Sequence, residues 1–290
     1  MKVINWGMIG CGSVAERKSG PAFYKAPGSA LVAVMGRRPA AAQDYATRHG
    51  IAKVYSDAAQ LIADPQIDAV YIATPPDSHF AYSLQVAAAG KHCCVEKPMS
   101  LNADSSQQMQ QAFVDAGRHL FVSYYRRSLP RFQQVRQWLQ DGRIGEVRHL
   151  SWTLTKPPTD GDRSASPNWR TDPQIAGGGY FADFASHDLD RRFASGALGM
   201  GCWNFVADRR EDRVDIIGSK GRIGFSVFDE YPVRLDADQQ LSLQIANPEH
   251  IQWHHVLGMN AHIRGEARHP AVAAQALKTD GVMDRILGRE

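Results

Sequence analysis

The chain has 290 residues, which exceeds most single domains and suits two. Its hydrophobic share of 43% and charged share of 22% are ordinary for a globular protein and exclude a disordered chain. The 33 basic and 30 acidic residues are scattered without a long basic run, which argues against nucleic-acid binding, and no apolar stretch of about 18 residues could span a membrane.

The four cysteines bear on the compartment. Cys11, Cys93, Cys94 and Cys202 have neither the spacing of a zinc site nor the density of a disulfide framework. Reduced thiols, together with an N-terminus that lacks an apolar segment followed by a cleavage site, lead us to expect a cytoplasmic protein.

Short apolar runs alternate with helical patterns in the first part of the chain. Residues 3–9 and 30–35 are typical of buried parallel strands, and residues 14–24 between them form a helical pattern. The alternation continues with helices at 40–49, 58–63, 80–89 and 103–116, and with strands at 54–55, 69–73, 92–95 and 120–124. Asn102 is the expected N-cap of the last of these helices. This α/β pattern predicts a doubly wound parallel sheet, a Rossmann domain of residues 1–122.

The pattern changes beyond that point. A helix is expected at 131–140 and a strand at 147–155, followed by a long polar loop at 156–179. Strands at 198–206, 213–218 and 222–227, the last two joined by the turn 218–221, predict an antiparallel meander. Residues 123–290 are therefore expected to form an α+β domain with a mainly antiparallel sheet.

A glycine-rich turn directly follows the first strand and opens the first helix. It comprises Gly10, Cys11, Gly12, Ser13, Val14 and Ala15, which match G-x-G-x-x-G/A. The first glycine permits the tight turn, the second lets the backbone approach a pyrophosphate, and Ala15 lets the helix pack close to the strand. A plain tight turn is the alternative, but the strand–helix–strand context favours dinucleotide binding.

The end of the second strand bears on cofactor choice. An NAD site usually carries an acid there to bind the ribose diol, yet no carboxylate occurs between Glu16 and Asp44. The strand ends instead in Gly36, Arg37 and Arg38, whose guanidinium groups suit a 2′-phosphate. NADP is therefore favoured over NAD, although one arginine could instead only stack on adenine.

Three further motifs identify a resemblance: Ala73 to His79 (ATPPDSH), Glu96-Lys97-Pro98, and three glycines at 177–179 leading to Asp183 to Asp190 (DFASHDLD). With the glycine-rich turn, the chain resembles the Gfo/Idh/MocA family of oxidoreductases. The likeness runs from residue 3 to about 190 and resumes at about 193. Single motifs would be poor evidence, but jointly they are specific.

The resemblance implies that Lys97 and His187 face the nicotinamide and the substrate carbonyl or hydroxyl, with Asp183 one helical turn before the histidine. The spacing supports this independently, because residues four apart on a helix share one face. Alcohol oxidation needs a base for the hydroxyl proton, and carbonyl reduction needs the same group as an acid. We assign Lys97 as this general acid/base, with His187 orienting the substrate or sharing the proton, and leave open which of the two transfers it.

Further residues are candidates for the cofactor and substrate sites. Thr74, Pro75, Pro76, His79, Glu96, Trp169 and Arg170 are expected near the cofactor. Tyr125 and Arg126 could reach the substrate or act as a hinge. A metal site made of Asp183, His187, Asp188 and Asp190 is disfavoured, because Asp188 and Asp190 lie on other helix faces and the family chemistry needs no metal.

The chain departs from the family pattern after Asp190. Relatives continue with a longer helix, a linker and at least one strand, whereas here Arg191-Arg192 lead directly to Phe193. This apparent internal deletion, near 190–193, predicts a missing helix end and a missing hairpin partner for the strand at 198–206. In the family this domain's sheet lies under the active site and often mediates dimers, so a homodimer through it is expected but placed in doubt.

Two kinds of function follow from this sequence. The resemblance implies hydride transfer between nicotinamide and a hydroxyl or carbonyl carbon of a sugar, polyol, inositol or related diol. The deletion supports a catalytically impaired NADP(H)-binding sensor of the same fold, or a variant that folds poorly. Every motif residue expected for catalysis is present, which favours the enzyme.

Overall fold

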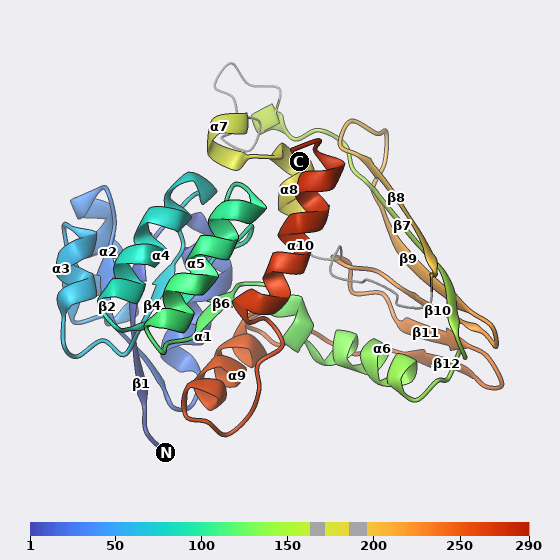
Figure 1. Ribbon diagram of the computed structural model, residues 1–290, viewed down its shortest axis with the longest axis horizontal. Helices are drawn as coiled ribbons and strands as arrows, with labels where there is room; N and C mark the ends of the chain where they lie inside the picture. Colours follow the sequence, from blue (N-terminus) through green and yellow to red (C-terminus); the bar gives the residue numbers. More distant parts are fainter. Residues whose placement is uncertain (163–171, 186–195, 290) are drawn as a thin grey trace. The chain divides into compact units, whose positions relative to one another are not determined.

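The computed structural model describes residues 1–162, 172–185 and 196–289. Within these residues the strands form two six-stranded sheets, here called sheet A and sheet B (Figure 1). No helix in the described part of the chain is both long and apolar enough to cross a bilayer.

Sheet A is parallel throughout and has the order β3-β2-β1-β4-β5-β6. Its strands are β1 (Ile4–Ile9), β2 (Ser29–Met35), β3 (Lys53–Tyr55), β4 (Ala69–Ile72), β5 (His92–Val95) and β6 (Leu120–Val122). The strand order reverses between β1 and β4, the point at which open α/β sheets bind ligands beyond the carboxyl ends of their strands. The expected doubly wound Rossmann sheet is confirmed.

The helices around sheet A follow the predicted alternation. They are η1 (Ala15–Ser19, a π-helical stretch), α1 (Gly20–Lys25), α2 (Pro39–His49), α3 (Ala58–Ala63), η2 (Pro76–Ser78), α4 (His79–Ala88), α5 (Ala103–Asp115) and η3 (Tyr125–Ser128). Asn102 caps α5 as expected, because its side chain accepts a hydrogen bond of 2.8 Å from the backbone N–H of Ser105.

Two helices from the end of the chain complete the cover of sheet A. They are α9 (Trp253–Ile263) and α10 (Ala273–Ile286). Val256 of α9 is buried in one apolar core with Phe23, while Ala276 of α10 is buried in the other with Phe113. The indole N–H of Trp6 donates a buried hydrogen bond of 3.0 Å to Asn260, which fixes α9 to β1.

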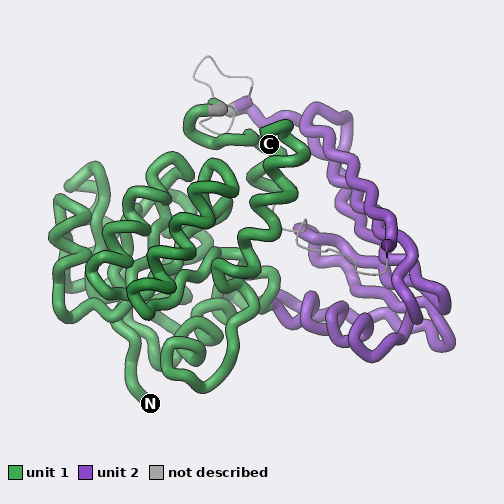
Figure 2. Tube along the Cα trace, in the orientation of Figure 1, with its two compact units in different colours: residues 1–128, 172–190, 248–290 green, residues 129–171, 191–247 purple. Residues whose placement is uncertain are grey.

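The chain divides into two compact units that differ from the expected split at residue 122 (Figure 2). Unit 1 comprises Met1–Ser128 together with stretches that begin at Asp172 and Pro248, and it contains α7 (Pro173–Ala176) and α8 (Gly179–Ala185). Unit 2 begins at Leu129 and its last stretch ends at Asn247. The difference arises because α9 and α10 bury their apolar faces on the Rossmann sheet rather than on sheet B.

Unit 2 is built on sheet B, whose order is β12-β11-β10-β9-β7-β8. Its elements are α6 (Pro130–Gln140), β7 (Val147–Thr155), η4 (Asp160–Asp162), β8 (Leu198–Asn204), β9 (Glu211–Gly218), β10 (Arg222–Phe225), β11 (Val233–Asp236) and β12 (Gln240–Leu243). Burial alternates along β9, so that Val214 and Ile216 are buried while Arg213 and Ile217 are exposed. The mainly antiparallel second sheet is confirmed.

One expected strand pairing is wrong. The strand at 198–206 does not join the antiparallel meander; as β8 it pairs in parallel with β7, which separates it from β9. Backbone hydrogen bonds from Lys156 to Asn204 (2.9 Å) and from Ala207 to Lys156 (3.2 Å) show the chain passing around the end of β7. Among the described strands β8 pairs with β7 alone, and it exposes Leu198 and Met200 at the sheet edge.

Candidate active site

The glycine-rich turn has the backbone that a dinucleotide site requires. Gly10 has φ = +100°, and a Cβ there would lie 2.9 Å from the carbonyl carbon of Ala73 at the end of β4. A Cβ at Gly12 would meet no heavy atom within 4 Å, so this glycine leaves open space. Helical turns follow without a break from Ser13, and Ala15 is fully buried against the sheet. These features fit a pyrophosphate group at the turn.

The arginines at the end of β2 are exposed. Neither Arg37 nor Arg38 forms a hydrogen bond or ion pair with another residue in the described ranges 1–162, 172–185 and 196–289. The carboxylates nearest along the chain are engaged elsewhere, since Arg48 binds Glu16 at 2.7 Å and Asp44 at 2.8 Å. The hydrogen bond from Arg48 also lowers the pKa of Glu16. Positive charge at the end of β2 is therefore not offset by these acids.

Lys97 and Asp183, two of the predicted catalytic residues, lie in direct contact. Lys97 follows β5, Asp183 lies on α8, and the Lys97 ammonium forms an ion pair with the Asp183 carboxylate. The same ammonium donates to the Asp183 carbonyl oxygen at 3.2 Å. Their side chains are only 15% and 14% exposed, so the pair is partly shielded from solvent. The Lys97–Pro98 peptide bond is cis.

The three glycines before Asp183 are required by backbone shape and close packing. Gly177 and Gly179 have φ values of +68° and +63°, which other residues rarely adopt. A Cβ at Gly178 would lie 2.8 Å from the Leu287 side chain and 2.9 Å from that of Ala182. The turn therefore brings the start of α8 against the end of α10, and Asp183 follows one turn later.

Glu96, the neighbour of Lys97, is buried within a hydrogen-bonded network that the sequence did not indicate. Its carboxylate accepts from the Tyr71 hydroxyl at 2.6 Å, from the Gln252 amide at 3.2 Å and from the Lys97 backbone N–H at 3.2 Å. Gln252 lies 156 residues away along the chain. A contact of that separation gives no local sequence signal.

His79 joins two loops of the site instead of facing solvent. Its ring nitrogens lie 2.8 Å from the carbonyl oxygen of Thr74 and 2.9 Å from that of Pro98, and its side chain is fully buried. Burial lowers the pKa of His79, so the neutral ring donates to one carbonyl at a time. The Ser78 hydroxyl also donates to that of Thr74 at 2.7 Å, which fixes the loop containing Pro75 and Pro76.

The other predicted residues are placed as follows. Arg126 donates to the Tyr125 hydroxyl at 2.6 Å and stacks over its ring at 4.8 Å, both in η3 at the end of the Rossmann part of unit 1. Trp169, Arg170, His187, Asp188 and Asp190 lie outside the described residues. Among the residues that are described, no group of three or more His, Cys, Asp or Glu side chains could hold a metal ion.

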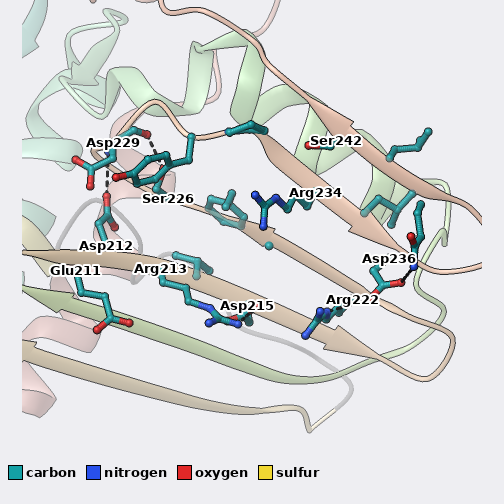
Figure 3. A pocket seen from close by; sticks show the side chains of 18 of the residues that line it. Glu211, Asp212, Arg213, Asp215, Arg222, Ser226, Asp229, Arg234, Asp236 and Ser242 are labelled. Carbon is teal, nitrogen blue, oxygen red and sulfur yellow. Dashed lines mark hydrogen bonds and ion pairs between the residues drawn. The ribbon is translucent and has the colours of Figure 1, made fainter.

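Unit 2 has a hollow of its own on sheet B, with a volume of about 890 Å³ (Figure 3). Its charged side chains largely pair with one another. Arg213 binds Asp215 at 2.6 Å, and Arg222 binds Asp236 at 3.3 Å. None of the residues predicted to bind cofactor or substrate lines this hollow.

Comparison with known proteins gives matches over both parts of the chain. Residues 4–124 match the model described as "Oxidoreductase family, NAD-binding Rossmann fold", and residues 132–191 match the "GFO/IDH/MocA C-terminal domain". Oxidoreductase P35 of Formosa agariphila is 34% identical, in an alignment that covers 98% of this chain and 98% of that protein.

Two solved structures share the fold. A levoglucosan dehydrogenase in complex with NADH and levoglucosan has a TM-score of 0.85 at 22% identity, over 99% of this chain and 97% of that one. A 3-ketoreductase from Actinomadura kijaniata in complex with NADP and TDP-benzene has a TM-score of 0.83 at 19% identity, over 98% of this chain and 96% of that one. The two neighbours hold different nicotinamide cofactors.

Proposed function

Because the chain belongs to the GFO/IDH/MocA family of oxidoreductases, we propose that it transfers a hydride between NADP and a hydroxyl or carbonyl carbon of a sugar, polyol, inositol or related diol. The family makes the chain an NAD(P)-dependent oxidoreductase that acts on CH–OH groups. The preference for NADP, the substrate class and the role of each residue are the proposal.

The ion pair between Lys97 and Asp183 is the observation that supports catalysis best. The pair brings together two residues that are 86 positions apart in the sequence. It lies at the carboxyl end of β5, which is the neighbour of β4 in sheet A. The residue after β4, Ala73, contacts Gly10 of the glycine-rich turn. Open α/β sheets place their ligands at this edge. A sensor that only binds the cofactor has no need of a shielded lysine–carboxylate pair there, so the pair favours an enzyme.

The chain's own groups handle the proton. When bound, the nicotinamide accepts or supplies the hydride. During oxidation Lys97 Nζ, as the neutral amine, takes the proton of the substrate hydroxyl and becomes an ammonium; during reduction the ammonium gives that proton to the oxygen and becomes the amine. Asp183 holds that nitrogen in place through its carboxylate and its carbonyl oxygen. His187, which follows Asp183 by four positions, orients the substrate or shares the proton, and Tyr125 and Arg126 contribute to substrate binding.

The cofactor is held by the rest of the predicted set. Gly10, Cys11, Gly12, Ser13 and Val14 cradle the pyrophosphate, while Arg37 and Arg38 bind the 2′-phosphate. The loops after β4 and β5, which contain Thr74, Pro75, Pro76, Glu96 and Lys97, line the nicotinamide side, with Trp169 and Arg170 nearby. His79 serves this site by fixing the Thr74 and Pro98 loops together.

We also propose that the protein is a cytoplasmic homodimer formed through sheet B. The exposed apolar side chains of β8 support association, since unpaired edges attract further strands. Sedimentation equilibrium of the purified protein measures this directly, and a monomer at micromolar concentration would remove the dimer from the proposal.

A titration with NADPH and NADH, followed by fluorescence, tests the function. At saturation, a panel of sugar and inositol ketones is then added while the reduced-nicotinamide absorbance is monitored. We expect tighter binding of NADPH and its oxidation by at least one panel member. Tight binding without turnover of any sugar, polyol or inositol substrate, in either direction, would favour the sensor.

A further inference from the structure

The Glu96 carboxylate is held by more donors than a strand-end residue normally needs. The side chain is 9% exposed, and its hydrogen bonds come from β4, from the residue before α9 and from its own neighbour, Lys97. A buried carboxylate is costly unless it is fully hydrogen bonded, so this set of donors stabilises it in one orientation.

Tyr71 makes the shortest of these hydrogen bonds, at 2.6 Å. It lies on β4, paired with Cys94 of β5, and its ring stacks on Phe23 with 4.5 Å between centroids. Burial, and secondarily the charge of Glu96, raise the pKa of Tyr71 well above its ordinary value. The hydroxyl therefore stays protonated and serves as the donor to Glu96.

Gln252 provides the second side-chain donor. It is 1% exposed, and its amide nitrogen must face Glu96 because two oxygens would repel. The Oε1 atom of the same amide has no hydrogen-bond partner among the described residues. Among the described residues, the hydrogen bond to Glu96 is therefore the contact that offsets the burial of this amide.

We propose that Tyr71 and Gln252 are positioning residues for Lys97, acting through Glu96. Glu96 is the acid nearest to Lys97 along the chain, yet within the described residues no ion pair joins it to the Lys97 ammonium. Tyr71 and Gln252 hold the Glu96 carboxylate away, so that the ammonium binds Asp183 and remains available to a substrate. The same bonds fix the backbone N–H of Lys97. The effect on turnover rests on the proposed function, but the effect on Lys97 itself does not.

The test uses Tyr71→Phe and Gln252→Met, each alone and combined with Glu96→Gln. The rate at which acetic anhydride modifies Lys97, followed by peptide mass spectrometry across pH, gives the pKa of Lys97 without any substrate. We expect each single variant to raise that pKa by about half a unit to one unit, because the released carboxylate turns toward the ammonium. In the Glu96→Gln background neither replacement should shift it further.

Tyr45→Phe is the matched control, since it also removes a buried tyrosine hydroxyl, one with no hydrogen-bond partner among the described residues. It should leave the Lys97 pKa unchanged. Thermal unfolding and NADPH binding of each variant show that it is folded. An unchanged Lys97 pKa in folded Tyr71→Phe and Gln252→Met, or an equal shift with and without Glu96, would overturn the proposal.

Turnover provides a separate readout. With an accepted substrate, Tyr71→Phe should lower kcat about tenfold and move the pH profile by the same amount as the Lys97 pKa, with KM for NADPH nearly constant. A pKa shift in a protein that turns over no substrate would support the positioning role and count against the proposed function. The two proposals can therefore fail independently.

Discussion

The charged side chains after β5 of sheet A and the ion pairs across sheet B are arranged in different ways. In unit 1, Lys97 and Glu96 are partly or wholly buried and bind partners 86 and 156 residues away, Asp183 and Gln252. On sheet B of unit 2, ion pairs such as Arg222 with Asp236 are exposed and join adjacent strands. Buried pairs that need distant segments are expensive to build and rarely serve stability alone. The strand ends of sheet A therefore hold the partly buried ion pair that the proposed chemistry requires.

Lys97→Ala is expected to have the largest effect. Removing a general acid/base costs about 10²- to 10⁴-fold in kcat, whereas NADPH binding should change only a few-fold because the pyrophosphate and 2′-phosphate contacts remain. Steady-state kinetics and a fluorescence titration measure the two quantities. Retained turnover would remove lysine from the mechanism. Lys91→Ala is a suitable control, because among the described residues Lys91 donates to the backbone carbonyls of Asp64 and Ile67 and lies outside the predicted site.

Buried histidines of unit 1 should make its stability sensitive to acid. Burial lowers the pKa of His92 to about 4 and that of His269 to about 3, from the ordinary value of 6.5, with neighbouring histidines adding to the effect. The folded state thus binds fewer protons than the unfolded state below pH 6.5, so stability is full above that pH and is lost as the pH falls toward 4.

We expect a loss of roughly 2–4 kcal/mol in the free energy of unfolding between pH 7 and pH 5, allowing for partial exposure. Urea denaturation at several pH values measures it. His92→Phe keeps an aromatic ring beside His119. In this variant the free energy of unfolding should depend less on pH, by the amount that His92 contributes. A free energy that does not change over this interval would mean that these rings are not held neutral.

Replacing Arg37 and Arg38 together by alanine tests whether these exposed arginines of unit 1 bind the 2′-phosphate of NADPH. NADPH affinity should fall by about 1–3 kcal/mol, because a charge-assisted contact to the 2′-phosphate is lost, while NADH affinity should change little. Isothermal titration with both cofactors compares them. Equal losses would show that these arginines do not distinguish the cofactors.

Arg222→Ala in unit 2 should have the smallest effect. The side chains of Arg222 and Asp236 are 57% and 46% exposed, and exposed pairs contribute from nothing to about 1 kcal/mol. Chemical denaturation should show a change below about 1 kcal/mol, with kinetics unaltered. A marked loss of activity would contradict the separation between the two units and assign the hollow on sheet B a part in function.

The elements of sheet A were predictable because each gives a local pattern: apolar runs for strands, a cap at Asn102 and glycines at the turn after β1. Lys97 and Asp183 were singled out by their motifs, but the ion pair between them joins segments 86 residues apart and was not predicted. Tyr71 gave no signal, since a tyrosine in a buried strand looks like any core residue. β8 pairs in parallel with β7 because one edge of β7 is bound to β9 and the other edge is left for β8. Nothing in the sequence of residues 198–206 indicates this partner or this direction. The packing of α9 and α10 on sheet A likewise depends on contacts between segments that are far apart in the sequence.

That packing has a consequence for synthesis on the ribosome. When residues 1–128 emerge, both apolar faces of the Rossmann sheet still lack Val256, Met259, Ala273 and Ala276, and the indole of Trp6 lacks Asn260. The nucleotide-binding unit is therefore finished only after nearly the whole chain has been translated, with unit 2 made in the interval. A nascent chain halted before α9 would present uncovered apolar surface, the kind that holding chaperones bind.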